Sequence, residues 1–174
     1  MKILVRNYLI GTLIFILLLC AVHLPFSTQY RSIDISYPAD NYFKDGLVLL
    51  SHDSLTNAVK AFTSAITYQP AFAPFHYYLA LTYERQEEYE RAIAEYNVVI
   101  KIDPEFYPAF YNLGNIMGHN KEYDQAISLL RRAVQLNPYY INAFMALADI
   151  YTKTGDHASA EKIFNYLKYI GYDK

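Results

Sequence analysis

The chain has 174 residues, of which 53% are hydrophobic, and a formal net charge of -2. This length allows one domain with a sizeable core, and the charge balance argues against a nucleic-acid-binding protein, which would carry a basic excess. Cys20 is the single cysteine, so the composition excludes an intrachain disulfide.

A long apolar run opens the chain. Residues 8–24 (YLIGTLIFILLLCAVHL) contain no formally charged side chain. Together with residues 3–5 they reach the roughly 20 residues that a helix needs to cross a bilayer. Lys2 and Arg6 lie on the N-terminal side of the run. By the positive-inside rule, this flank predicts a signal-anchor or single transmembrane helix over residues 1–24, with a cytoplasmic N-terminus and an extracytoplasmic (in a bacterium, periplasmic) remainder.

Two other interpretations of this run stay open. A cleaved secretory signal has the same charged start and apolar core, although residues 21–23 (Ala-Val-His) lack the small residue that usually ends a cleavage site. A lipoprotein signal ending at Cys20 fits less well, because the bulky Leu19 precedes the cysteine. Residues 25–38 (PFSTQYRSIDISYP) have no helical period and predict a linker.

The remainder of the chain repeats itself. Pro70, Pro104 and Pro138 are spaced 34 residues apart. The same period recurs in a set of alanines: Ala58, Ala92, Ala126 and Ala160. Repetition at this length is typical of a stacked solenoid. It divides the chain into four units: 39–72, 73–106, 107–140 and 141–174.

Each unit predicts two helices. Positions 4, 7, 8 and 11 of a unit follow the spacing of one helix face, and so do positions 20, 24 and 27. A short turn is therefore expected near positions 14 to 16. Position 20 is always alanine, and position 8 is always small, so the two helices of a unit can approach closely. Ser54, Asp124 and Asp156 lie near the expected starts of second helices, where they could cap free N–H groups.

The third unit carries the fullest motif: Tyr111-Asn112-Leu113-Gly114-Asn115, then Tyr123-Asp124-Gln125-Ala126-Ile127, then Asn137-Pro138. Over residues 39–174 the pattern resembles the tetratricopeptide repeat family. The resemblance implies an all-α fold: a right-handed superhelical solenoid of four helix-turn-helix repeats, here preceded by the expected N-terminal transmembrane helix.

Both ends of the array differ from its middle. Position 21 is apolar in the first three units but Glu161 in the last, and position 28 is likewise apolar until Lys168. In the first unit, Asn41 and Asp45 occupy positions that are apolar in the other units. Terminal repeats need such polar outer faces for solubility. The pattern predicts four units, capped at both ends, with no fifth.

The sequence offers little for catalysis. It has no glycine-rich phosphate loop, and none of its five histidines stand three or four residues apart, the spacing of a helix-borne metal site. His76 occupies a large-residue position of its unit and is expected to be packed in the core. We therefore expect no enzyme activity, no cofactor and no metal.

The resemblance places a binding groove along the first helices, at positions 2, 5, 9 and 12. The candidate groove residues are Phe43, Leu47, Leu50, Tyr77, Leu81, Tyr111, Asn115, Met145 and Asp149. Family members that grip a partner's terminal carboxylate carry lysine or arginine at position 5, whereas this chain has mainly aromatic residues there. For each groove residue, packing between helices is the alternative role.

The expected function is that of a membrane-anchored, non-enzymatic adaptor, or scaffold, that binds a segment of a partner protein during cell-envelope assembly. No nucleic acid or small-molecule substrate is expected. The alternatives are a secreted or periplasmic soluble adaptor after signal cleavage, and an accessory subunit of an envelope enzyme or secretion complex.

Overall fold

The computed structural model describes residues 36–172, which belong to one compact unit. Within this range the chain forms α-helices and no β-strand. The helices are α2 (Ser36–Ser51), α3 (Leu55–Tyr68), α4 (Ala73–Arg85), α5 (Tyr89–Ile102), α6 (Tyr107–His119), α7 (Tyr123–Leu136), α8 (Ile141–Lys153) and α9 (His157–Tyr169). The expected membrane anchor and most of the expected linker lie outside the described residues.

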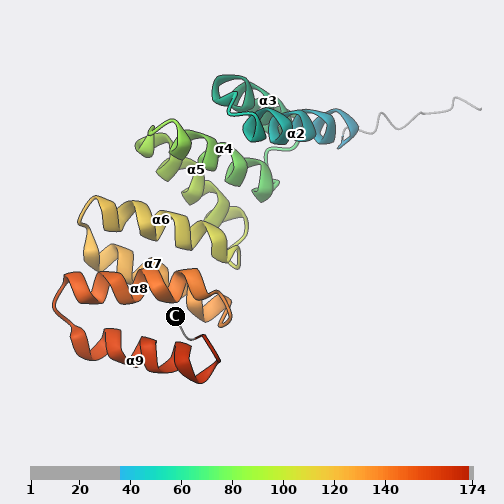
Figure 1. Ribbon diagram of the computed structural model, residues 1–174. Helices are drawn as coiled ribbons and strands as arrows, with labels where there is room; N and C mark the ends of the chain where they lie inside the picture. Colours follow the sequence, from blue (N-terminus) through green and yellow to red (C-terminus); the bar gives the residue numbers. More distant parts are fainter. Residues whose placement is uncertain (1–35, 173–174) are drawn as a thin grey trace, which may run out of the picture. The chain divides into compact units, whose positions relative to one another are not determined.

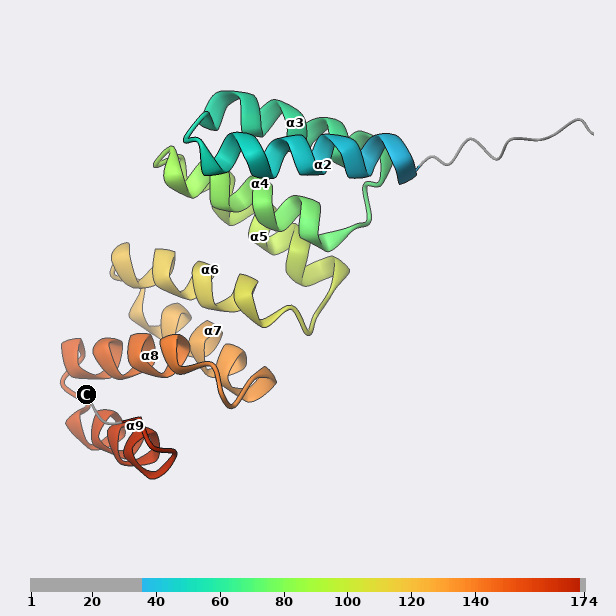
Figure 2. The same cartoon turned by 45° about the vertical axis from the view of Figure 1, so that its right-hand side comes forward.

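The helices form hairpins that stack in chain order (Figures 1 and 2). The two helices of each unit pack against each other, and the second helix of each unit packs against the first helix of the next. We refer to the side formed by α2, α4, α6 and α8 as the first-helix face. The structure confirms the helical repeat solenoid.

The turn between the two helices of a unit lies where the period predicts it. Position 15 is in the left-handed region in every unit, at Asp53, Glu87, Lys121 and Gly155, with φ between 58° and 80°. The following amide closes the turn: the N–H of Glu122, for example, donates to the carbonyl of Met117 over 2.9 Å. This is the hydrogen-bond pattern of a Schellman helix end. Glycine, which adopts this conformation without strain, occupies the position only in the last unit.

Small residues bring the helices of a unit together, as the sequence predicts. The four alanines at position 20 are buried. At position 8, a Cβ atom built on Gly46 would lie 2.5 Å from a ring carbon of Phe62, and one on Gly114 would lie 2.8 Å from Cγ of Leu130. These large side chains from position 24 therefore fill the space that a missing Cβ leaves open.

Three helix starts differ from expectation. Helix α2 begins at Ser36, three residues before the expected unit, because Pro38 can sit in a first turn, where N–H groups have no intrahelical acceptor. Of the expected caps, only the Asp156 side chain accepts a hydrogen bond from a backbone N–H of its helix, that of Ser159 over 3.0 Å. Ser54 makes no cap bond, and Asp124 lies inside the first turn of α7.

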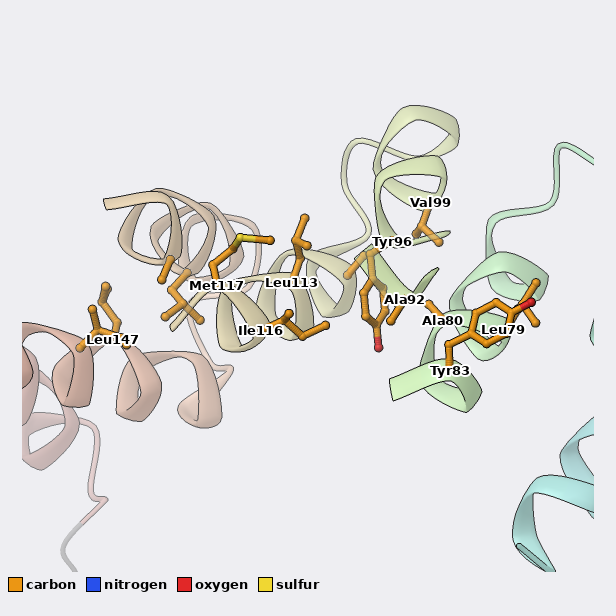
Figure 3. Close-up of a cluster of buried hydrophobic side chains, with 14 of the residues drawn as sticks. Leu79, Ala80, Tyr83, Ala92, Tyr96, Val99, Leu113, Ile116, Met117 and Leu147 are labelled. Atoms are coloured by element: carbon orange, nitrogen blue, oxygen red, sulfur yellow. The ribbon is translucent and has the colours of Figure 1, made fainter. Parts of the chain in front are cut away.

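The core runs along the stack and ends at the outer helices. Figure 3 shows its central part, from Leu79 and Tyr83 on α4 to Leu147 on α8. Position 24 is fully buried as Phe62 and Tyr96, but Phe164 on α9 is 47% exposed. Glu161 and Lys168 are exposed on the same helix.

No helix among residues 36–172 combines the length and the apolar character that a membrane span requires. The same residues contain no group of histidine, cysteine, aspartate and glutamate side chains that could hold a metal ion.

Candidate functional site

The aromatic residue of the first unit, Phe43, is a packing residue. Its ring lies 4.9 Å from that of Phe75, 5.3 Å from that of Tyr78 and 5.8 Å from that of Phe62, measured between centroids. Phe43 is partly buried and joins the first unit to the second. For this candidate groove residue, contacts within the protein occupy much of the surface of the side chain.

Tyr77, one unit later, is half-buried and is held by aromatic rings and one hydrogen bond. Its ring lies 5.0 Å from Phe106 and 6.0 Å from Tyr96. Its hydroxyl accepts a hydrogen bond from Nδ2 of Asn112 over 3.3 Å, which links α4 to α6. Because a tyrosine held in this way loses little freedom on binding, it is suited to contact a partner.

Tyr111 belongs to a cluster of tyrosines on the first-helix face. The Tyr140 ring lies 5.0 Å from the rings of both Tyr107 and Tyr111. Burial raises the pKa of Tyr140 to about 12, and the nearby hydroxyls of Tyr111, Tyr77 and Tyr107 add to the rise. The Tyr140 phenol therefore stays neutral at physiological pH and keeps its O–H donor.

The sequence interpretation missed the ring partners of this cluster. Phe106 and Tyr140 occupy position 34, the last position of a unit, and Phe72 occupies it in the first unit. An aromatic residue repeated in phase was a signal that could have found them.

A buried polar network lies beneath the cluster. Asn112 donates to the hydroxyl of Tyr96 over 3.1 Å, and that hydroxyl donates to Oε2 of Glu84 over 2.8 Å. Burial raises the pKa of Tyr96 far above its usual range, and the Glu84 charge adds to the rise. The network ties α4, α5 and α6 together and places the half-buried Glu84 carboxylate at position 12 of its unit.

The aliphatic groove candidates are only partly exposed. Leu47, Leu50 and Leu81 are partly buried and pack against the core. They give the first-helix face an apolar floor along α2 and α4.

The last candidates lie on α6 and α8. Asn115 and Asp149 line one small hollow of about 60 Å³, together with Gly118 and Lys153. Asp149 is paired with Lys153, with 2.6 Å between Oδ2 and Nζ. Met145 is 38% exposed on α8. The structure thus brings Asn115 and Asp149 together.

Larger hollows lie elsewhere and contain none of the candidate residues. One of about 600 Å³ lies on α7 and is lined in part by Arg131, Arg132 and Asp124. Another of about 420 Å³ lies where α7, α8 and α9 meet, with Lys162 on its lining. Both are open to solvent.

Comparisons with known proteins agree on the fold. Three family models, each described as tetratricopeptide repeat, match residues 43–105, 95–128 and 119–170. A search of curated proteins found no match.

Several solved structures are similar to this chain. MamA from Desulfovibrio magneticus RS-1 has a TM-score of 0.68 at 20% identity, over 75% of this chain and 74% of that one. PilF from Pseudomonas aeruginosa has a TM-score of 0.71 at 22% identity, over 80% of this chain and 64% of that one. The first repeat domain of Spaghetti (RPAP3), bound to the HSP90 peptide SRMEEVD, has a TM-score of 0.66 at 17% identity, over 69% of this chain and 95% of that one.

At these identities the structural likeness shows the fold alone, whereas the family models match the sequence itself across residues 43–170. The family models, the repeated helical hairpins and the small residues between the helices all indicate tetratricopeptide repeats. The chain belongs to the tetratricopeptide repeat family.

Proposed function

We propose that this protein is a non-enzymatic adaptor that binds a segment of a partner protein on its first-helix face. The observation that carries the proposal is the cluster of half-buried tyrosines around Tyr77 and Tyr111, with an apolar floor beside it. Partly exposed aromatic groups on a rigid surface usually mark an interaction site. The domain of Spaghetti that shares this fold binds a short peptide, which supports a segment as the partner.

Replacing Tyr77 and Leu81 together by alanine tests this proposal. Partners are first identified by crosslinking the full-length chain in its native membrane, followed by mass spectrometry. The double variant should recover at least about tenfold less of these partners, because a buried aromatic anchor commonly contributes 2 kcal/mol or more to binding. Circular dichroism should show unchanged helix content.

Two further variants make this result decisive. Tyr139→Ala with Tyr169→Ala removes two highly exposed tyrosines that lie outside the first helices, and partner recovery should not change. Met145→Ala with Asp149→Ala alters exposed residues of the first-helix face at little structural risk, and recovery should fall. Equal recovery by all variants would exclude this face as the binding site.

We also propose that residues 1–24 anchor the protein to a membrane, with the repeats on the extracytoplasmic side and a role in cell-envelope assembly. The proposal rests on the uncharged run at residues 8–24 and on Lys2 and Arg6 before it. The intact mass of the mature protein and its retention in carbonate-washed membranes test the anchor. A mature chain that begins after residue 24 would refute it and favour a secreted adaptor.

A further inference from the structure

The charges on the first-helix face have one sign at the groove positions. Among the residues at positions 2, 5, 9 and 12 of the four units, the charged ones are Asp40, Glu84 and Asp149, and all are acids. Such a surface repels an acidic segment and attracts a basic one.

The three acids differ in how they are placed. Asp40 is exposed at the first turns of α2, and Asp149 already has the ammonium group of Lys153 as a partner. Glu84 is half-buried and makes no ion pair with any described residue. A carboxylate that is partly removed from water without a cation beside it is costly in free energy. A cation that binds Glu84 therefore contributes more binding free energy than one that binds an exposed acid.

The cation nearest to Glu84 in the sequence is committed elsewhere. The guanidinium group of Arg85 lies 2.7 Å from Oδ1 of Asp53 and donates to the carbonyl of Leu50 over 2.8 Å. Both contacts are with the first unit. Arg85 therefore joins the first two units and does not compete for Glu84.

The structure also fixes the direction of the Glu84 carboxylate. Its Oε2 accepts the hydrogen bond from Tyr96, whereas no described side chain donates to its Oε1. Burial is the main cause that raises the pKa of Tyr77, the hydrogen bond from Asn112 opposes it, and the Glu84 charge adds to the rise. Nδ2 of Asn112 donates to the hydroxyls of both Tyr77, over 3.3 Å, and Tyr96, over 3.1 Å, and the Tyr96 hydroxyl donates to Glu84 over 2.8 Å. These hydrogen bonds place the carboxylate and Tyr77 close enough to contact the same ligand.

We propose that the partner segment presents an arginine or lysine side chain that donates to Oε1 of Glu84 and lies against the ring of Tyr77. This rests on the proposed function and names the chemistry of the partner. The ring face attracts a cation, and the carboxylate gives a charge-assisted hydrogen bond. Apolar neighbours of that side chain then contact Leu81 and Tyr111.

A peptide library tests the proposal on the full-length chain in nonionic detergent. Phage that display random 12-residue peptides are selected on the protein, and the affinities of the best peptides are measured by fluorescence anisotropy. Selected peptides should be enriched in arginine and lysine. Exchanging the cation of a selected peptide for glutamate should weaken binding at least about tenfold, and so should 500 mM salt.

Glu84→Gln is the matched variant, because the glutamine carbonyl can still accept the hydrogen bond from Tyr96. This substitution should lower the affinity for a cationic peptide at least about tenfold. Glu90→Gln changes an exposed acid on α5 and should leave the affinity unchanged.

The outcomes separate the two proposals. In one outcome, the selected peptides depend on Tyr77 and Leu81 but carry no cation; in another, they bind the Glu84→Gln variant as tightly as the unchanged protein. Either result contradicts the proposal of a basic partner segment and is still consistent with the adaptor function. A library that yields no peptide dependent on Tyr77 and Leu81 overturns both.

Discussion

His76 is a buried histidine whose two ring nitrogens both face acceptors. Nδ1 lies 2.7 Å from Oε2 of Glu95, and Nε2 lies 3.0 Å from the carbonyl oxygen of Pro70. A neutral imidazole has only one N–H, so both contacts are hydrogen bonds only when the ring is protonated. The hydrogen bond to Glu95 raises the pKa of His76, and burial opposes this effect without cancelling it.

This pair predicts a dependence of stability on pH. Because the pKa of His76 is higher in the folded than in the unfolded state, protonation favours folding. The contribution is fully present below the unfolded pKa of about 6.5 and is lost as the pH rises through the raised folded pKa. The free energy of unfolding, measured with urea at a series of pH values from 5.5 to 8.5, should therefore fall as the pH rises.

Two variants assign this effect to the pair. The His76→Gln variant should lose this contribution to the pH dependence of the free energy of unfolding altogether. The Glu95→Gln variant should show a smaller contribution, because the main cause of the raised His76 pKa is then gone. His52, His119 and His157 are exposed and remain in both variants. A variant with the pH dependence of the unchanged chain would show that His76 is not responsible.

At the scale of the helix, the alanine of position 20 controls how closely two helices pack. Ala92 on α5 is fully buried and belongs to the same buried cluster as Ala80 on α4 (Figure 3). Ala94 lies two residues further along α5 and is exposed. The two alanines share a helix and its intrinsic preferences, and they differ in burial.

Replacing each of these alanines by leucine should therefore give different results. Ala92→Leu should lower the free energy of unfolding by about 1 to 3 kcal/mol or more, because the added atoms force the helices apart. Ala94→Leu should change it by less than about 0.5 kcal/mol. The midpoints of urea unfolding measure both. Similar shifts for the two variants would contradict the close packing at position 20.

At the scale of the whole molecule, α9 has a charged side where α3, α5 and α7 are apolar. Positions 21 and 28 carry Val59 and Ile66 on α3, but Glu161 and Lys168 on α9. The apolar pairs are half-buried and pack against the core, whereas Glu161 and Lys168 are exposed. In a repeat solenoid each unit contacts only its neighbours, so an apolar outer face requires a neighbour to cover it.

Changing both charges to isoleucine should therefore make the protein associate with itself. Glu161→Ile with Lys168→Ile recreates the apolar stripe of an inner unit, and light scattering during size-exclusion chromatography should show a mass that rises with concentration. Glu161→Gln with Lys168→Gln removes the charges without adding apolar surface. If both variants keep the mass of the unchanged chain, the charges do not prevent association.

The sequence by itself determined the repeat architecture of this protein. The period places the helices, the turns at positions 14 to 16 and the small residues at positions 8 and 20. These features are readable because they follow from local helix geometry and from contacts between neighbouring segments. The N-terminal anchor and the groove remain predictions, because the anchor lies outside the described residues and the groove depends on a partner.

Only the tertiary structure decided what each side chain on the first-helix face does. Phe43 and Tyr77 share position 5, yet Phe43 packs between units, whereas Tyr77 joins a hydrogen-bond network through Asn112. The side chains in these contacts come from different helices, up to 35 residues apart in the sequence. The periodicity of one helix cannot reveal such contacts, because the side chains of neighbouring helices decide which atoms meet.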